Sequence, residues 1–128
     1  MNRTPLQTRV GIDLDFGCSI GAKQIALLEA IQSQGSISGA ARFLDLSYRG
    51  VQLLVGKIDK SVGEPVIKAR PGGLKGGGAV LTLTGEQLVR LYRAIEARAQ
   101  TVALQEREEL SRLARPKIPP RTAPGFGD

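Results

Sequence analysis

Residues 36–62, SISGAARFLDLSYRGVQLLVGKIDKSV, decide the fold. Gly39–Leu44 is just long enough to form one short helix, and Tyr48–Val62 has the length and apolar spacing of a second one. Asp45–Ser47 leaves a connection of about three residues between them, which is the length of the tight turn in a helix-turn-helix. The stretch therefore predicts a short helix that braces a longer one.

The ends of both helices are marked by residues that suit them. Hydroxyls in Ser36–Ser38 can cap the short helix, and Ser47 can cap the long one. Gly63 is expected to end the long helix, and Pro65 prevents it from resuming. Leu46, in the turn, is expected to point inward and fix the turn to the core.

The second helix has two faces of different chemistry. One face is apolar and is expected to be buried; it gathers Val51, Leu54, Val55, Ile58 and Val62. The opposite face gathers Arg49, Leu53, Gly56 and Lys60, with Gln52 and Lys57 at its borders. Gly56 costs up to about 1 kcal/mol relative to Ala in a helix, so its presence requires a reason.

Downstream of this helix, Val66–Arg70 and Ala79–Leu83 have the character of two short strands. The connection at 71–78, PGGLKGGG, contains neither G-x-G-x-x-G nor G-x-x-x-x-G-K-[ST] and joins two strands, so a nucleotide-binding loop is disfavoured. A strand hairpin after a helix-turn-helix is the arrangement of a winged helix, with Lys75 at the tip of the wing. A plain hairpin turn is the alternative interpretation of the same glycines.

Upstream, residues alternate between apolar and polar from Val10 to Phe16, which predicts a strand. Its partner is left open between the wing sheet and a second copy of the chain. Lys23–Gln34 has helical spacing, and Gly35 is expected to end that helix.

Beyond the wing, Thr84 is expected to cap a helix from Gly85 to about Leu113. The segment from Leu88 to Ile95 is expected to close the domain's own core, whereas from Ala99 onward the helix extends beyond the domain. We expect the helix to form a homodimer through Ile95, Ala99, Val102 and Leu110. The expected fold class is mainly α with a small β-sheet: a winged helix-turn-helix with a long C-terminal dimerisation helix. It spans residues 10–113, followed by a proline-rich, disordered tail over 114–128.

Charge and composition limit the function. The chain has a net charge of +6, and between residues 42 and 75 seven basic residues stand against three acidic ones, which favours binding to a polyanion. There is no histidine, so an enzyme is a poor fit and neither a metal site nor a cofactor is expected. The single cysteine, Cys18, is expected to be a small packing residue in a cytoplasmic protein. No apolar run is long enough to span a membrane.

Several motifs together resemble one family. They are Gly35-Ser-Ile-Ser38 followed by Ala40-Ala41, Ser47-Tyr48, Gly72-Gly-Leu-Lys-Gly-Gly-Gly-Ala79, Leu81-Thr82 and Gly85. This series resembles the N-terminal DNA-binding domain of ModE-type molybdate-responsive regulators over roughly Lys23 to Ala97. The helix-turn-helix alone is also similar to LysR-type regulators. Position 52 is Gln where the ModE pattern has Trp.

The resemblance implies a winged-helix dimer that binds a palindromic operator through the wing and the third helix. The length of 128 residues leaves no room for the oxyanion-binding domains of full-length members. Molybdate sensing is therefore not assigned to this chain, and two alternatives stay open: a response through a separate effector-sensing protein, or no ligand at all.

Two function classes remain. The first is a sequence-specific transcriptional regulator that binds double-stranded DNA, with the recognition helix in the major groove and the wing on the backbone. The second is a winged-helix protein–protein interaction module, in which the basic face is an ordinary solvated surface. For the first, the predicted DNA contacts are Ser47, Tyr48, Arg49, Gln52, Leu53, Gly56, Lys57, Lys60, Arg70, Lys75, Gly76 and Gly77.

Overall fold

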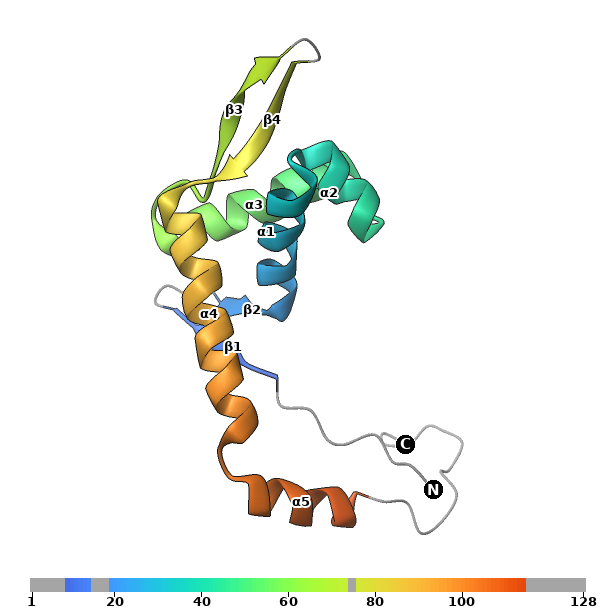
Figure 1. The fold of residues 1–128 in the computed structure, drawn as a ribbon, viewed down its shortest axis with the longest axis vertical. Coiled ribbons are helices and arrows are strands. Elements are labelled where there is room, and N and C mark those ends of the chain that lie inside the picture. Colours follow the sequence, from blue (N-terminus) through green and yellow to red (C-terminus); the bar gives the residue numbers. More distant parts are fainter. Residues whose placement is uncertain (1–8, 15–18, 74–75, 115–128) are drawn as a thin grey trace, which may run out of the picture.

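The computed structural model of the chain describes residues 9–14, 19–73 and 76–114. A short hairpin, three helices, a second hairpin and two further helices follow one another (Figure 1). In chain order the elements are β1 (Gly11–Asp13), β2 (Ser19–Gly21), α1 (Ala22–Gln34), α2 (Ile37–Leu44), α3 (Tyr48–Val62), β3 (Ile67–Gly73), β4 (Gly76–Leu81), α4 (Leu83–Thr101) and α5 (Leu104–Leu113). This order confirms the predicted winged helix-turn-helix.

The core is formed mainly by α1 and α3, whose apolar faces meet. From α1 it contains Ile25, Leu27, Leu28 and Ile31, and from α3 it contains Val51, Val55 and Ile58. Leu54 and Val62, which were predicted on the same face of α3, are half-buried. The amphipathic pattern of the long helix therefore identified its buried face.

Small residues let α2 lie close to α1. Gly39, Ala40 and Ala41 are all buried. A Cβ atom at Gly39 would lie 2.9 Å from the Cβ of Gln34, which is closer than two carbon atoms normally approach. The short helix begins at Ile37, two residues earlier than the predicted Gly39.

The helix caps set the geometry of the motif. The hydroxyl oxygens of Ser36 and Ser47 accept hydrogen bonds from the third backbone N–H beyond them, both at 2.9 Å. Gly35 and Gly63 end α1 and α3 with φ values of 78° and 81°, a left-handed conformation that costs glycine little. The bounds predicted for the recognition helix, Tyr48 to Val62, are confirmed.

The wing is fastened to the end of α1 opposite to the N-terminal hairpin. The backbone N–H of Ala79 in β4 donates to the carbonyl oxygen of Gly35 at 2.9 Å. A side chain at Gly78 would overlap that same oxygen, so the two backbones meet directly. The strands run through the glycines to the pair Gly73 and Gly76, further than the predicted 66–70 and 79–83, because backbone pairing does not need side chains.

The helix after the wing begins earlier than predicted. Thr82, not Thr84, is the cap, and its hydroxyl oxygen accepts from the N–H of Gly85 at 3.1 Å. The N–H of Thr82 also donates to the carbonyl of Val66 at 2.9 Å, which fixes Thr82 in the extended conformation of a cap.

The prediction of one continuous helix from Gly85 to Leu113 is wrong. The helix α4 ends at Thr101, Ala103 adopts a left-handed φ of 52°, and α5 runs in another direction (Figure 1). Thr101 and Val102 are consecutive β-branched residues, which lower helix propensity at this point. Leu110 therefore lies on a different helix from Ile95, and a single stripe does not join the two.

The N-terminal strand has neither of the partners considered for it. Within the described residues it spans Gly11–Asp13 and pairs antiparallel with Ser19–Gly21, so that Ile12 lies opposite Ile20. The sequence pattern missed the second strand because three residues are too few to show a period. Ile20 is buried in the core, which anchors this hairpin to the start of α1.

Leu46 is also placed differently from the prediction. It is 37% exposed, at the rim of a small apolar hollow of about 140 Å³ between α1, α2 and α3. Asp45, with a left-handed φ of 58°, turns the chain outward just before it. Leu27 covers the core at this edge instead.

Three predictions concern residues outside the described part of the chain: Lys75 at the wing tip, Cys18 as a packing residue, and the disordered tail beyond Ala114. Among the described helices, none combines the length and apolar character that a membrane span requires.

Candidate nucleic-acid interface

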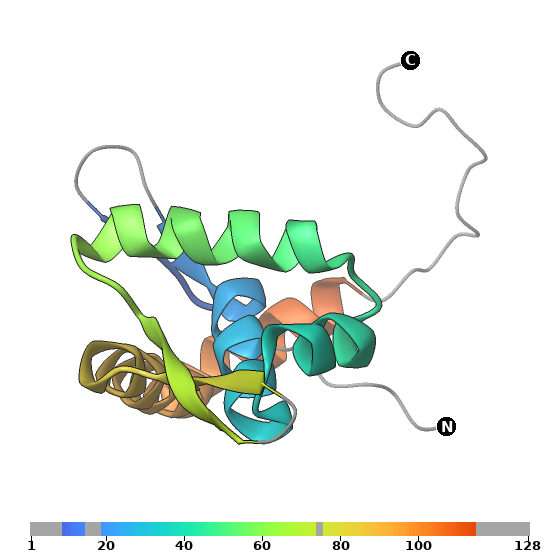
Figure 2. The same cartoon turned by 90° about the horizontal axis from the view of Figure 1, so that it is seen from above.

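The outer face of α3 presents the residues predicted to read bases. Arg49 and Gln52 are exposed, and so is Leu53, with 56% of its surface accessible. An exposed apolar side chain of this size among basic neighbours favours contact with an apolar group of a partner over contact with water. In Figure 2, α3 lies along one side of the domain and the wing along the other, with α1 and α2 between them.

Gly56 lies in the middle of this face. A Cβ atom built there would have no other atom within 4 Å, and Gly56 does not have a left-handed φ. Packing and backbone geometry within the described residues therefore do not require glycine at this position. The helix-weakening residue leaves the backbone of α3 accessible between Leu53 and Lys60.

The starts of α2 and α3 meet the base of the wing around a shallow hollow of about 110 Å³. It is lined by Ser36, Ile37, Ser38, Tyr48, Gly78 and Ala79. Tyr48, half-exposed at 50%, stands between the hollow and the outer face of α3. Ser47 beside it is exposed, and since its oxygen accepts the capping bond, its hydroxyl proton can be donated outward. The structure thus brings Tyr48 beside the base of the wing, directly after the exposed Ser47.

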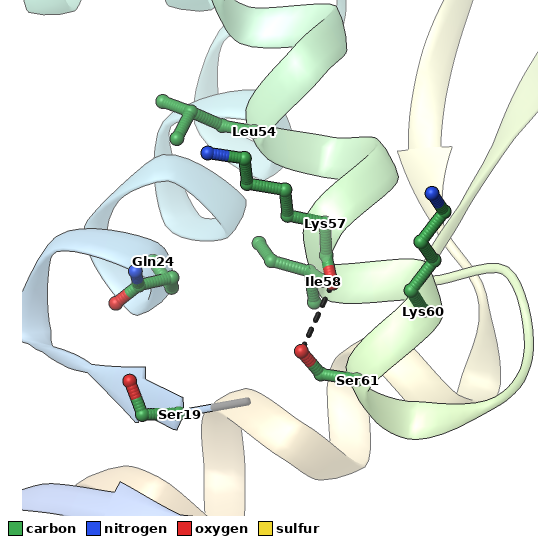
Figure 3. A pocket seen from close by; sticks show the side chains of 7 residues that line it. All are labelled: Ser19, Gln24, Leu54, Lys57, Ile58, Lys60 and Ser61. Carbon is green, nitrogen blue, oxygen red and sulfur yellow. Dashed lines mark hydrogen bonds between the residues drawn. The ribbon is translucent and has the colours of Figure 1, made fainter. Parts of the chain in front are cut away.

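The second half of α3 borders a larger hollow, of about 280 Å³, on the side of the N-terminal hairpin (Figure 3). It is lined by Ser19, Gln24, Leu54, Lys57, Ile58, Lys60 and Ser61. Lys57 and Lys60 extend from α3 in different directions, and the hydroxyl of Ser61 donates to the carbonyl of Lys57 at 2.9 Å. This lining contains no acidic side chain.

Ser19 and Gln24 are additions that sequence reasoning missed. Gln24 accepts a hydrogen bond from the N–H of Gly21 through its side-chain oxygen at 2.9 Å, which leaves its amide N–H groups as donors. Both residues lie far from α3 in the sequence, in the part of the chain that precedes the helix-turn-helix. No local pattern marks them, because only the packing of β2 and α1 against α3 brings them beside Lys57.

Arg70 on β3 has an internal partner as well as an exposed position. Its guanidinium donates to the carbonyl oxygen of Gly35 at 3.4 Å, across the base of the wing. Gly76 and Gly77 lie further out on β4, and their contact with DNA stays a prediction.

One acidic residue near this face is used inside the fold. The carboxylate of Asp59 accepts from the N–H of Val66 at 2.9 Å, which ties the end of α3 to the start of the wing. Among the described residues there is no cluster of side chains suited to hold a metal ion.

The predicted dimer contacts fall on two helices. Ile95 is 45% exposed on one face of α4, and Ala99 is half-buried at the border of that face. Val102, the residue directly after α4, is 49% exposed. Leu91 shares this face with 52% exposure, so the prediction that the segment from Leu88 to Ile95 closes the core is wrong for Leu91 and Ile95, whereas Leu88 does pack against the core. Leu110 is 56% exposed on α5. We call Leu91, Ile95 and Val102 the α4 apolar stripe.

Comparison with known proteins identifies relatives of this domain. A scan against protein-family models found no match. The molybdenum-pterin-binding protein MopB of Rhodobacter capsulatus is 49% identical over 81 residues, covering 63% of this chain and 30% of MopB. The molybdenum transport protein ModE of Azotobacter vinelandii is 36% identical over 101 residues, covering 79% of this chain and 37% of that protein.

A solved structure has a similar fold. Full-length LysG of Corynebacterium glutamicum, an LTTR protein, has a TM-score of 0.50 and 25% identity, over 69% of this chain and 28% of LysG. The chain thus spans about a third of the length of the curated relatives that it matches. The ModE relatives from Haemophilus influenzae and Escherichia coli are described as transcriptional regulators. Through its winged helix, this chain belongs to the ModE family of transcriptional regulators.

Proposed function

We propose that the chain is a dimeric, sequence-specific DNA-binding regulator of transcription. The observation that carries the proposal is the outer face of α3, where exposed Arg49, Gln52 and Leu53 surround a glycine that the fold itself does not require. A helix of this kind enters the major groove with its first turns against the base edges. The family membership supports the same reading.

Each predicted base contact has a specific chemistry. Arg49 pairs with the N7 and O6 acceptors of guanine, and Gln52 pairs with adenine. Leu53 contacts a thymine methyl group, which suits its exposed apolar side chain. Gly56 allows the backbone of α3 to approach the floor of the groove.

Phosphates on both sides of α3 hold the helix in place. On one side are the wing and the exposed start of α3, with Ser47 and Tyr48. On the other side is the hollow of Figure 3, where Lys57 supplies charge and Ser19 and Gln24 supply hydrogen-bond donors. Such contacts fix register on the duplex without reading its sequence.

A homodimer through the α4 apolar stripe places two recognition helices on one duplex. Two-fold symmetry then requires inverted half-sites, with centres about 34 Å apart when the two helices enter successive turns of the same groove. The break at Ala103 removes Leu110 from this stripe, so we assign the interface to α4.

A protein–protein interaction module is the second candidate. It is favoured by the exposed leucines of α5, Leu104, Leu110 and Leu113, which no described part of the chain covers. The two candidates differ in whether the basic face of α3 binds a duplex.

The folded protein is expected to bind duplex DNA with an affinity that falls steeply as salt rises. Each neutralised phosphate contributes a slope of about −0.9 in the logarithm of affinity against the logarithm of salt concentration. Fluorescence anisotropy with a labelled duplex between low and physiological salt measures this slope. Absence of duplex binding above background at low salt, with circular dichroism showing folded protein, would favour the interaction module.

Arg49→Ala is expected to weaken binding selectively, by about 1–3 kcal/mol at one base position, because the bidentate contact to guanine is lost. The measurement is binding to a set of duplexes that each differ at one position. Arg42→Ala is the matched control: it removes the same charge from an exposed position on α2 and should weaken all duplexes alike. A uniform loss for Arg49→Ala as well would make Arg49 a phosphate contact.

A further inference from the structure

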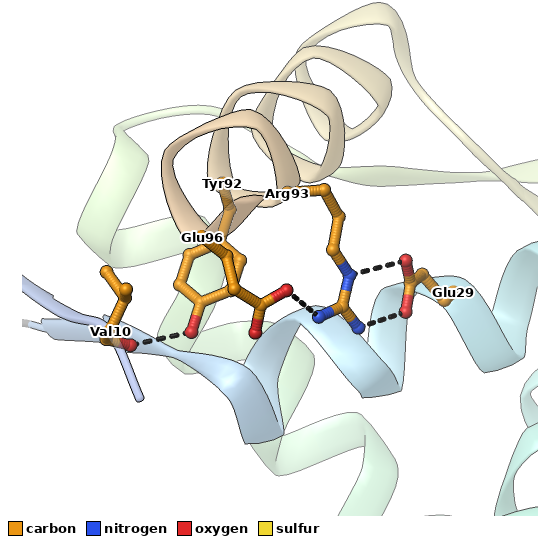
Figure 4. A network of polar contacts seen from close by, with 5 residues as sticks. All are labelled: Val10, Glu29, Tyr92, Arg93 and Glu96. Carbon is orange, nitrogen blue, oxygen red and sulfur yellow. Dashed lines mark hydrogen bonds and ion pairs between the residues drawn. The ribbon is translucent and has the colours of Figure 1, made fainter. Parts of the chain in front are cut away.

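A polar network joins α4 to the rest of the domain, nearly three turns beyond the start of that helix (Figure 4). Arg93 Nε donates to Glu29 Oε2 at 2.9 Å, and Arg93 Nη2 lies 2.6 Å from Glu29 Oε1. The third guanidinium nitrogen of Arg93 lies 2.6 Å from Glu96 Oε1. The Arg93 guanidinium thus bridges α1 and α4 with two parallel bonds to one carboxylate.

The preceding residue adds a second attachment. Tyr92 is 1% exposed, and its hydroxyl donates to the carbonyl oxygen of Val10 at 2.6 Å. Adjacent side chains of α4 therefore hold two different parts of the domain, the N-terminal hairpin and α1. We call Arg93, Glu29 and Tyr92 the α4 clamp.

The charges in the clamp are stable at neutral pH. The hydrogen bonds from Arg93 lower the pKa of Glu29, and those to Glu29 and Glu96 raise the pKa of Arg93, against a smaller opposing effect of burial. The side chains of Arg93 and Glu29 are each 38% exposed. The two parallel hydrogen bonds, more than burial, therefore fix the relative position of the two side chains.

The clamp is a second attachment of α4 to the domain, beyond the one at the start of the helix. At its start, α4 is fixed by Gly85, whose Cα packs against the carbonyl of Val66. After the clamp, Ala97, Arg98 and Thr101 are exposed. Leu88 and Val89 pack against the core between these two attachments, and the clamp fixes the direction of α4 beyond them.

A small swing of α4 about its start has a large effect at the far end. From Gly85 to Thr101 the helix is about 24 Å long, so a swing of about 10° moves its end by about 4 Å. This displacement exceeds the rise of one base pair, about 3.4 Å. Because α4 carries the apolar stripe of the dimer, its direction decides how far apart the two α3 helices lie.

We propose that Arg93 is a positioning residue that sets the operator half-site spacing by holding α4 against Glu29 of α1. It touches no base, and it acts on specificity through the angle between the dimer helix and the recognition helix. This inference rests on the proposed dimer and extends the proposed function to the spacing of the site.

The test compares Arg93→Gln with the wild-type protein. Arg90→Gln is the matched control, because Arg90 is exposed on the same helix, forms no ion pair within the described residues, and carries the same charge. A spin label at Lys60→Cys, in a Cys18→Ser background, reports the distance between the two α3 helices in the DNA-free dimer. Unlabelled wild type, Arg93→Gln and Arg90→Gln, all of which keep Lys60, are titrated with duplexes whose two half-sites are moved apart or together by single base pairs.

We expect a single narrow distance in the wild type and in Arg90→Gln, and a broadened one in Arg93→Gln with the dimer mass unchanged. Wild-type affinity should fall about tenfold or more for a shift of one base pair, and Arg93→Gln should lose most of this discrimination. An equally narrow distance in Arg93→Gln overturns the inference, as does a monomer at the labelling concentration. A broadened distance without any duplex binding supports the clamp but refutes DNA recognition, which separates the two failures.

Discussion

Gly85→Ala is expected to lower the free energy of unfolding by about 1–3 kcal/mol, the range for overpacking a filled site. The added methyl group would overlap the carbonyl oxygen of Val66 and lie 3.3 Å from the Cβ of Leu81. Neither neighbour can move freely, because the same Val66 carbonyl accepts from the N–H of Thr82 and Leu81 is buried in the core. Urea denaturation followed by circular dichroism measures the change.

Gly56→Ala is the matched control for this experiment. It is also a glycine in a helix, but its new methyl group meets nothing within 4 Å, so stability should rise by up to about 1 kcal/mol. The two substitutions should therefore differ in sign. If Gly85→Ala is as stable as Gly56→Ala, the tight contact between α4 and the wing base is wrong.

Ile95→Glu is expected to dissociate the dimer and reduce affinity for a duplex with two half-sites by about 100-fold or more. The reason is that linked half-sites gain about 10²–10⁴ in avidity, which separate domains lose. Ile95 lies in the middle of the α4 apolar stripe, so a charge there would be buried against the partner. Sedimentation gives the mass, and anisotropy with one-half-site and two-half-site duplexes gives the affinities.

Thr101→Glu introduces the same charge at an exposed position of α4 beside this stripe and should keep both the dimer and its affinity. Ile95→Glu should also bind a single half-site as wild type does, because α3 is unaffected. A dimer that survives Ile95→Glu would place the interface elsewhere, with the leucines of α5 as the next surface to test.

The boundaries of the helix-turn-helix could be predicted because they depend on local chemistry. Ser47 and Gly63 act on their own helix ends, and the sequence shows both. The break between α4 and α5 also has a local sign, the β-branched pair Thr101 and Val102. This signal is weak. The apolar and helix-favouring residues on either side of the pair favoured the prediction of one continuous helix.

Features that depend on distant parts of the chain were not predictable in the same way. Ser19 and Gln24 are brought beside Lys57 only by tertiary packing, as are Arg93 and Glu29 in the α4 clamp. Arg70 was predicted as a DNA contact, and the structure adds its hydrogen bond to Gly35 across the base of the wing. Sequence patterns report which side chains are available, and the fold decides which of them meet.

The residues that carry the family resemblance gain a structural meaning. Gly78 and Ala79 meet the carbonyl of Gly35, and Gly85 meets that of Val66. These contacts attach the wing to α1 and α4 to the wing. Gly78, Ala79 and Gly85 of the family motifs therefore lie in the contacts that orient the wing and α4, not in the face of α3 that is proposed to face DNA.

Selection of bound duplexes from a random pool tests the proposal of sequence-specific recognition most directly. We predict enrichment of one related set of sequences, arranged as inverted half-sites about one helical turn apart. One position should prefer guanine, and the same selection with Arg49→Ala should lose the preference at that position. Recovery of the pool unchanged, with folded protein confirmed, would contradict sequence-specific recognition by α3.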